Sequence, residues 1–172
     1  MLSNELIKLR YFEPEDIDKL MTIRSSSKSY DFFYEFEPLN KTQQLQWWES
    51  SYNKKNEKNF IIISQETNQL VGTISLVNID NRNKKAELGR LFVFDEYLGK
   101  GFSKDAMKLV IDYGFKHLNL HKIYLEVFTA NKKAISLYEK MGFKEEGCLK
   151  AHIYKNGDYL DILLMSLFRS SQ

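Results

Sequence analysis

Short stretches of the chain alternate apolar and polar side chains, which is the pattern of β-strands that face a core on one side. Leu6 to Phe12 show this alternation first, and runs rich in isoleucine, leucine and valine follow later. The expected strands are residues 6–12, 59–64, 70–80, 86–94 and 122–129, followed by two strands that flank Asn156-Gly157. An Asn-Gly pair is a strong hairpin signal, because both residues tolerate the left-handed backbone of a tight turn.

Other segments space their apolar residues by three and four, as amphipathic helices do. Pro14 suits a first helical turn, and the helix that it opens ends at the serine-rich stretch 25–29. Further helices are expected over residues 42–52, from Ser103 as N-cap, and from Asn131 as N-cap to a closing Gly142. The order β-α-α-β-β-β-α-β-α-β-β predicts one α+β domain over residues 1–172. Its twisted sheet is expected to be mixed, mostly antiparallel and flanked by helices.

Composition and charge exclude several classes of function. The chain has 25 basic and 23 acidic residues, and this balance argues against a dedicated nucleic-acid binder. The N-terminal segment lacks the apolar run of a signal peptide, and no stretch reaches the roughly 20 apolar residues that cross a bilayer. The single cysteine, Cys148, has no partner residues at metal-site spacing. We therefore expect a cytoplasmic monomer or homodimer with no metal, nucleic-acid or membrane partner.

A glycine-rich loop follows the expected strand 86–94. Gly99 and Gly101 stand one residue apart just before a helix, and Lys100 adds positive charge between them. The first amides of a helix have no internal acceptor, and glycines let an anion approach them closely. The loop lacks the third glycine of a dinucleotide fingerprint and the Gly-Lys-Ser/Thr of a Walker loop. Taken alone, it fits either an anion site or a plain tight turn.

Three segments carry a more specific pattern: the strand AELGRLFV, the loop EYLGKGFSKDAM and the segment EVFTANKKAISLYEKMGFKEEG. Together they are similar to the GNAT superfamily of acyl-CoA-dependent N-acyltransferases. The third segment is the most specific, because Asn131, Tyr138 and Gly142-Phe143 occur at the family's spacing. The chain most resembles the branch of ribosomal-protein N-terminal acetyltransferases, which is itself similar to spermidine and aminosugar N-acetyltransferases. The loop departs from the motif at Glu96, where the family usually has Gln or Arg.

The resemblance implies acetyl-CoA as cosubstrate. It implies that loop amides cradle the coenzyme A pyrophosphate, and that one strand splays from the next and offers backbone groups to the pantetheine arm. Asn131 would contact the cosubstrate near its thiol. The implied binding residues are Leu91, Phe92 and Val93 in the strand, and Leu98, Gly99, Lys100, Gly101, Phe102 and Ser103 in the loop.

Acetyl transfer by direct attack requires a neutral amine, hydrogen-bond donors for the carbonyl oxygen and a proton for the leaving thiolate. The resemblance places the hydroxyl of Tyr138 beside the coenzyme sulfur as the acid. The alternative is a tyrosine that only packs its ring in the core, as helical tyrosines usually do. The donor to the carbonyl oxygen would be the amide of Leu91 or Phe92.

Glu87 is the preferred base, acting directly or through water. Two-residue alternation places it on the same strand face as Gly89 and Leu91. Glu126 is the second candidate, and water alone is the third. Either carboxylate could instead be solvated or paired with a cation, and Arg90 is a ready partner for one of them.

The aromatic N-terminal third is the expected acceptor side. A sugar or a nucleotide base stacks well on aromatic rings, whereas acidic side chains attract a cationic amine. The candidate acceptor-binding residues are Phe33, Tyr34, Glu35, Trp48 and Glu126. We favour a small primary amine such as an aminosugar or an aminosugar nucleotide. A polyamine, a protein N-terminus, or a non-catalytic acyl-CoA-binding regulatory domain are the alternatives.

Overall fold

The computed structural model describes residues 2–26, 40–52 and 54–169. In that part of the chain, eight strands form one sheet in the order β1-β2-β3-β4-β5-β6-β8-β7. The strands are β1 (Leu2–Ser3), β2 (Ile7–Tyr11), β3 (Lys58–Ser64), β4 (Leu70–Asp80), β5 (Lys85–Val93), β6 (Lys122–Phe128), β7 (Lys144–Lys155) and β8 (Asp158–Phe168). The α-helices are α1 (Ile17–Ser26), α2 (Lys41–Tyr52), α3 (Phe102–Lys116) and α4 (Lys132–Lys140). The predicted α+β class and the order of the predicted elements are confirmed.

The ends of two helices show how well local sequence patterns predict where a helix begins and ends. Asn131 caps α4 as predicted, because its Oδ1 accepts the amide of Ala134 at 3.1 Å. Gly142, at φ +92°, follows the end of the same helix in the left-handed conformation that favours glycine. The predicted cap at Ser103 is wrong. Gly101 is the N-cap of α3, at φ +89°, so that helix begins one residue earlier than Ser103.

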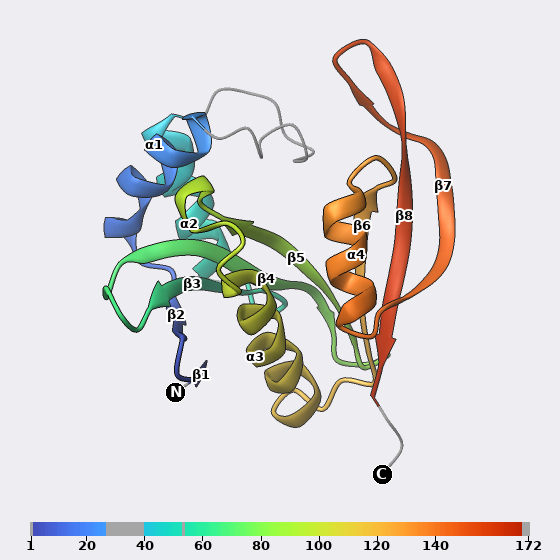
Figure 1. Cartoon of the computed structure of the whole chain (residues 1–172), viewed down its shortest axis with the longest axis horizontal. Coiled ribbons are helices and arrows are strands. Elements are labelled where there is room, and N and C mark those ends of the chain that lie inside the picture. Colours follow the sequence, from blue (N-terminus) through green and yellow to red (C-terminus); the bar gives the residue numbers. More distant parts are fainter. Residues whose placement is uncertain (1, 27–39, 53, 170–172) are drawn as a thin grey trace.

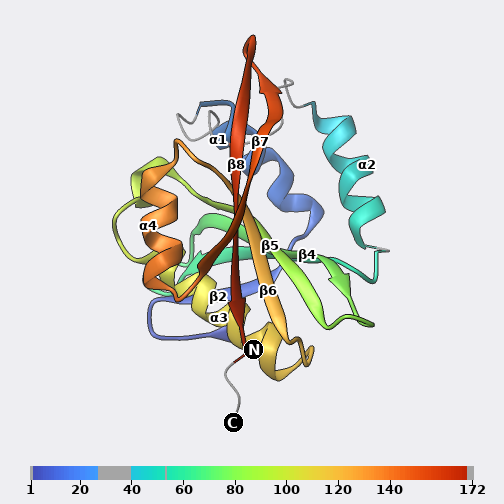
Figure 2. The same cartoon turned by 90° about the vertical axis from the view of Figure 1, so that its right-hand side faces the viewer.

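Two hydrophobic cores lie on opposite faces of the sheet. Alternation along β3 directs Ile62 into the larger core and Ile61 into the smaller one. The larger core includes the buried face of α3, with Met107 fully buried. The smaller core receives Leu20 from α1. Figure 2 shows α2 and α4 on opposite sides of the strands, so each face of the sheet has its own helical cover.

The pair formed by β5 and β6 is parallel and short. Its register comprises only Lys85–Lys122, Ala86–Ile123 and Glu87–Tyr124. Figure 1 shows the two strands diverging beyond these pairs. The splay expected from the family resemblance is therefore confirmed. Backbone groups of β5 that face this gap have no ladder partner in β6, and such groups need another partner when water is excluded.

A β-bulge in β5 changes which side chains share a face. Thr73 of β4 pairs with Phe92, but Ser75 pairs with Gly89, so β5 contains one extra residue between them. Arg90 takes up the distortion at φ +53°, and the Thr73 hydroxyl donates to the Arg90 carbonyl at 2.9 Å.

The consequence is a correction to the predicted alternation. Leu91 packs against the larger core together with Leu88, whereas Phe92 enters the smaller core. Leu91 therefore does not share the face of Glu87 and Gly89. The prediction failed because alternation with period two holds only where a strand carries no extra residue.

Candidate active site

The glycine loop is anchored by an aromatic side chain. Tyr97 ends a short 3-10 turn (Asp95–Tyr97), and its ring contacts that of Phe102 edge-on, with 5.8 Å between centroids. Gly99 and Gly101 both have positive φ, at +76° and +89°. Gly101, the N-cap of α3, has no side chain that could cap the helix. Its first amides therefore remain available to an anion, which fits the pyrophosphate of coenzyme A.

Glu96, the residue that departs from the loop motif, has a partner of its own. Burial raises the pKa of the neighbouring Tyr97 hydroxyl, and the charge of Glu96 and a hydrogen bond with it raise that pKa further. Lys100 lies over the same ring, with its Nζ 5.3 Å from the centroid. The negative charge of Glu96 is thus engaged by a side chain of the loop and partly balanced by a nearby cation.

Tyr138 approaches from α4. Its ring is half-buried against the larger core, 6.1 Å from the ring of Phe143. Burial raises the pKa of Tyr138 to about 12. Within the described part of the chain, no hydrogen bond involves its hydroxyl. The proton therefore stays on Oη throughout the physiological pH range.

Acidic side chains gather on the other face of the strands. Glu87 on β5 lies opposite Tyr124 on β6, and Glu126 lies two residues further along β6, where the strands separate. Their neighbours Leu88 and Leu125 point into the larger core, so alternation directs the two carboxylates away from it. The structure thus brings Glu87 and Glu126 together, whereas Tyr138 comes from the side of the larger core.

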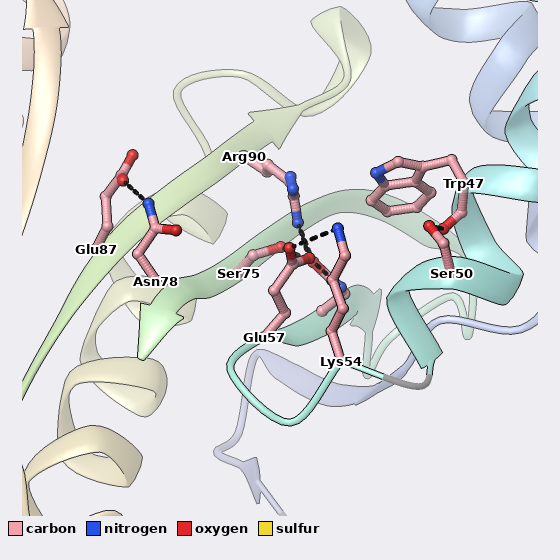
Figure 3. Close-up of polar contacts among 9 residues, drawn as sticks. Trp47, Ser50, Lys54, Glu57, Ser75, Asn78, Glu87 and Arg90 are labelled. Atoms are coloured by element: carbon pink, nitrogen blue, oxygen red, sulfur yellow. Dashed lines mark hydrogen bonds and ion pairs between the residues drawn. The ribbon is translucent and has the colours of Figure 1, made fainter. Parts of the chain in front are cut away.

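The Glu87 carboxylate lies among groups that shift its pKa. Its pKa is raised by burial and further by the charge of Glu126, while a hydrogen bond from Asn78 and the charge of Arg90 act in the opposite direction. Asn78 Nδ2 donates to Glu87 Oε2 at 2.8 Å (Figure 3). A raised pKa brings a carboxylate closer to the operating pH, where a general base is most effective.

Arg90 is held away from direct pairing with either candidate base. Its Nη1 donates to Glu57 Oε2 and to Asn59 Oδ1, each at 2.8 Å. Burial raises the pKa of Glu57, but the hydrogen bond and charge of Arg90, a hydrogen bond from Asn59 and the charge of Lys54 together lower it. Figure 3 shows the guanidinium between Glu57 and the ring of Trp47, whose centroid lies 5.1 Å from Cζ. The sequence left open a pairing of Arg90 with Glu87 or Glu126, and the structure shows an ion pair of Arg90 with Glu57.

Of the remaining candidates on the acceptor side, the structure describes Trp48. The half-buried Trp48 donates its Nε1 proton to the carbonyl of Phe12 at 3.1 Å. Phe33, Tyr34 and Glu35 lie outside the described residues.

Residues 7–144 match the family model described as the acetyltransferase (GNAT) domain. The chain belongs to the GNAT acetyltransferase family. It is 33% identical over 171 residues to spermidine N(1)-acetyltransferase of Vibrio cholerae, covering 97% of this chain and 95% of that protein. The spermidine N(1)-acetyltransferase of Escherichia coli strain K12 is 32% identical over 170 residues, covering 98% and 89%.

Solved structures of the Vibrio cholerae protein extend the comparison. Its complex with CoA and spermine has a TM-score of 0.89 to this GNAT chain at 29% identity, covering 96% of each. A dodecameric structure of the same protein has a TM-score of 0.81 at 29% identity, covering 96% and 95%. The enzyme is thus an acetyl-CoA-dependent N-acetyltransferase, which confirms the activity and the cosubstrate expected from the motifs.

Two site neighbours of this GNAT enzyme escaped the sequence analysis, namely Asn78 and Tyr124. An asparagine inside the apolar run of β4 is the signal that could have indicated a bulge there. Across the described ranges, no group of three His, Cys, Asp or Glu residues could hold a metal ion. No helix within those ranges is long and apolar enough to cross a membrane.

Proposed function

We propose that this enzyme acetylates a primary amine of a polyamine of the spermidine or spermine type. The observation that carries the proposal is similarity along nearly the whole chain to two spermidine N(1)-acetyltransferases. The similarity extends to a structure that holds spermine. A putative ribosomal N-acetyltransferase of Bacillus subtilis is also similar, at 30% identity over 173 residues, so a protein N-terminus is the second candidate acceptor.

The charges on the acceptor face agree with a polycationic substrate. Glu87 and Glu126 lie close enough for the charge of one to raise the pKa of the other. A cationic amine relieves this repulsion, because it places positive charge between two carboxylates. A polyamine keeps further cationic groups after one amine has lost its proton, whereas an aminosugar has only the one ammonium.

Two tryptophan rings of α2 on the acceptor side already have partners. The guanidinium of Arg90 covers a face of Trp47, and the indole N–H of Trp48 is bonded to backbone. Trp48 was a candidate acceptor-binding residue, and both contacts hold α2 against the neighbouring strands. The described residues favour the polyamine alternative over the aminosugar preferred from the sequence.

We propose the following roles for the residues of the site. When bound, acetyl-CoA supplies an acetyl group activated as a thioester. The amides of residues 98–103 would bind its pyrophosphate, backbone groups of residues 91–93 would orient its arm, and Asn131 would lie near its thiol. Glu87 takes a proton from the acceptor ammonium, and Tyr138 holds a proton on Oη as the acid. Glu87 and Tyr138 lie on opposite faces of the sheet, and the gap between β5 and β6 lies between them.

An acceptor panel tests the proposal. Thiol release from acetyl-CoA is measured with spermidine, spermine, an aminosugar, an aminosugar nucleotide and an N-terminal peptide. We expect turnover with the polyamines, with kcat/KM reduced roughly 10²-fold in Glu87→Gln. Glu126→Gln should act mainly on KM for the polyamine. Turnover with an aminosugar but not with spermidine would overturn the assignment, and binding of acetyl-CoA with no turnover at all would indicate a regulatory domain.

Assembly and extent remain predictions. We expect a monomer or homodimer that folds as one domain over residues 1–172. Light scattering on the purified chain distinguishes these states from a dodecamer such as that of the Vibrio cholerae protein.

A further inference from the structure

Asn78 interrupts the apolar strand β4 at a second bulge. Val77 pairs with Glu87, but the next pair joins Asp80 to Lys85, so β4 contains one more residue than β5 between the two pairs. Asn78 takes up the extra length in the left-handed conformation, at φ +50°. Ile79 still reaches the larger core, and Asn78 is left exposed. The bulge therefore turns an amide side chain toward β5 where regular alternation would have directed it into the core.

This side chain holds one oxygen of the proposed base. Asn78 Nδ2 donates to Glu87 Oε2 at 2.8 Å, as Figure 3 shows. The other oxygen lies beside a residue without a side chain, because a Cβ placed on Gly89 would be 3.6 Å from Oε1. The carboxylate is thus bound on one side by an amide and bordered on the other by the space that Gly89 leaves open.

We propose that Asn78 is a positioning residue that orients the Glu87 carboxylate so that Oε1 faces the acceptor amine. The inference rests on the proposed role of Glu87 as the base. A hydrogen bond to the ionised form also stabilises the carboxylate as an acceptor. It opposes the burial and the like charge of Glu126 that together raise the pKa of Glu87.

Other groups around Glu87 also shift its pKa. Arg90, on the same strand, lowers the pKa of Glu87 by its charge. From β6, Glu126 raises it, and the hydroxyl of Tyr124 responds to both carboxylates. Burial raises the pKa of Tyr124, as do the charges of Glu87 and Glu126, whereas a hydrogen bond from Asn78 lowers it. Asn78 therefore lowers the pKa values of two neighbouring acids, Glu87 and Tyr124, at the point where β5 and β6 separate.

Two substitutions separate the amide from the bulge. Asn78→Gly keeps a residue that adopts positive φ readily and removes the donor. Asn78→Asp keeps the size and replaces the donor with a second negative charge. Asn68 provides the matched control, because it has φ +54° in the turn between β3 and β4 and binds Lys8 Nζ at 2.8 Å. Asn68→Gly relaxes the same backbone strain at a distance from the carboxylates.

The readouts are the pH profile of kcat/KM for spermidine and the titration of Glu87 itself. The second is followed by 13C NMR of labelled glutamate carboxyl carbons in the ligand-free protein, with Glu87→Gln to assign the resonance. For Asn78→Gly we expect both midpoints to move up by about half a pH unit, since an exposed hydrogen bond to a charge is partly replaced by water. For Asn78→Asp we expect about one unit, from the nearby like charge. Asn68→Gly should leave both midpoints in place.

The outcomes distinguish this inference from the proposed function. Titration of Glu87 as in the wild type in both Asn78 variants overturns the positioning role, as does an equal shift in Asn68→Gly. A Glu87 resonance that shifts as expected, in a protein that does not acetylate spermidine, supports the contact and overturns the polyamine assignment instead. Thermal melting accompanies each variant, and Asn78→Asp decides the matter if Asn78→Gly does not fold.

Discussion

Replacing Tyr138 by Phe removes one hydroxyl and leaves the packing of the ring in place. The ring rests against Phe143 and the larger core, contacts that Phe reproduces. Among the described residues the hydroxyl makes no hydrogen bond, so its removal leaves no buried partner unsatisfied. We expect the free energy of unfolding to change by less than about 0.5 kcal/mol.

The effect on catalysis should be much larger. With a pKa of about 12, Tyr138 is almost fully protonated at neutral pH and can act as an acid in every molecule. Loss of a general acid costs 10²-fold to 10⁴-fold. A thiolate, with a pKa near 8.5, needs less help in leaving than an alkoxide would. We therefore expect kcat to fall by about 10²-fold, which corresponds to ~2.7 kcal/mol in the barrier.

The raised pKa also determines the alkaline behaviour. A tyrosine with the ordinary pKa of about 10 would lose half of its acid form at pH 10. Because burial raises the pKa of Tyr138 to about 12, its acid form persists through that range. The wild-type kcat should therefore not fall between about pH 8 and 10.5 through ionisation of this group. A decline with a midpoint near pH 10 would contradict the environment described for Tyr138.

Tyr113→Phe is the matched control. Burial and contacts with Tyr11 raise the pKa of Tyr113 to about 12 as well, but its ring stacks on His117 near the end of α3. The assay is steady-state thiol release with spermidine, with calorimetry for the affinity of coenzyme A. We expect a wild-type kcat in Tyr113→Phe and an unchanged Kd in both variants. A wild-type kcat in Tyr138→Phe, or an equal loss in the control, would remove Tyr138 from the mechanism.

Three glycines carry further predictions. Gly101→Val should weaken coenzyme A binding at least about tenfold by calorimetry, since valine strains the φ of +89° in the amide cradle. Gly157→Val is the control, because Gly157 has φ +91° in the distant β7–β8 turn, and it should leave this binding unchanged. Equal losses in the two variants would refute the loop assignment. In Gly89→Ala the new methyl would lie 3.6 Å from the proposed base, so kcat/KM should fall about tenfold with the melting temperature preserved; full activity would place the amine elsewhere. Gly72→Ala would put Cβ 2.1 Å from the Phe92 carbonyl oxygen and should lower the free energy of unfolding by about 3 kcal/mol or more in urea titrations. A stable Gly72→Ala would contradict the close approach of β4 to β5.

Local patterns in the sequence were sufficient for the elements and for the cosubstrate. Alternation and helical spacing identified the long strands and the helices, because each pattern reflects side chains that face one core. The spacing of Asn131, Tyr138 and Gly142 identified the family, because the three residues cap, occupy and follow one short helix. These features depend on residues that are near neighbours along the chain.

The acceptor side depended on tertiary structure. The order of preference among acceptors changed with the similarity to two spermidine N(1)-acetyltransferases and to a structure that holds spermine, which the short motifs had not indicated. Arg90 itself selects Glu57, a residue 33 positions away, over the acids nearer in sequence. Such pairings are decided by strand register rather than by spacing along the chain.

The sequence by itself determined the fold class and the family, because these follow from local periodicity and short motifs. Tertiary structure alone decided the two bulges, and with them the faces on which Leu91 and Asn78 lie. An extra residue in one strand shifts every later side chain, and it becomes visible only against the partner strand. That shift is what brings an amide from β4 to the Glu87 carboxylate.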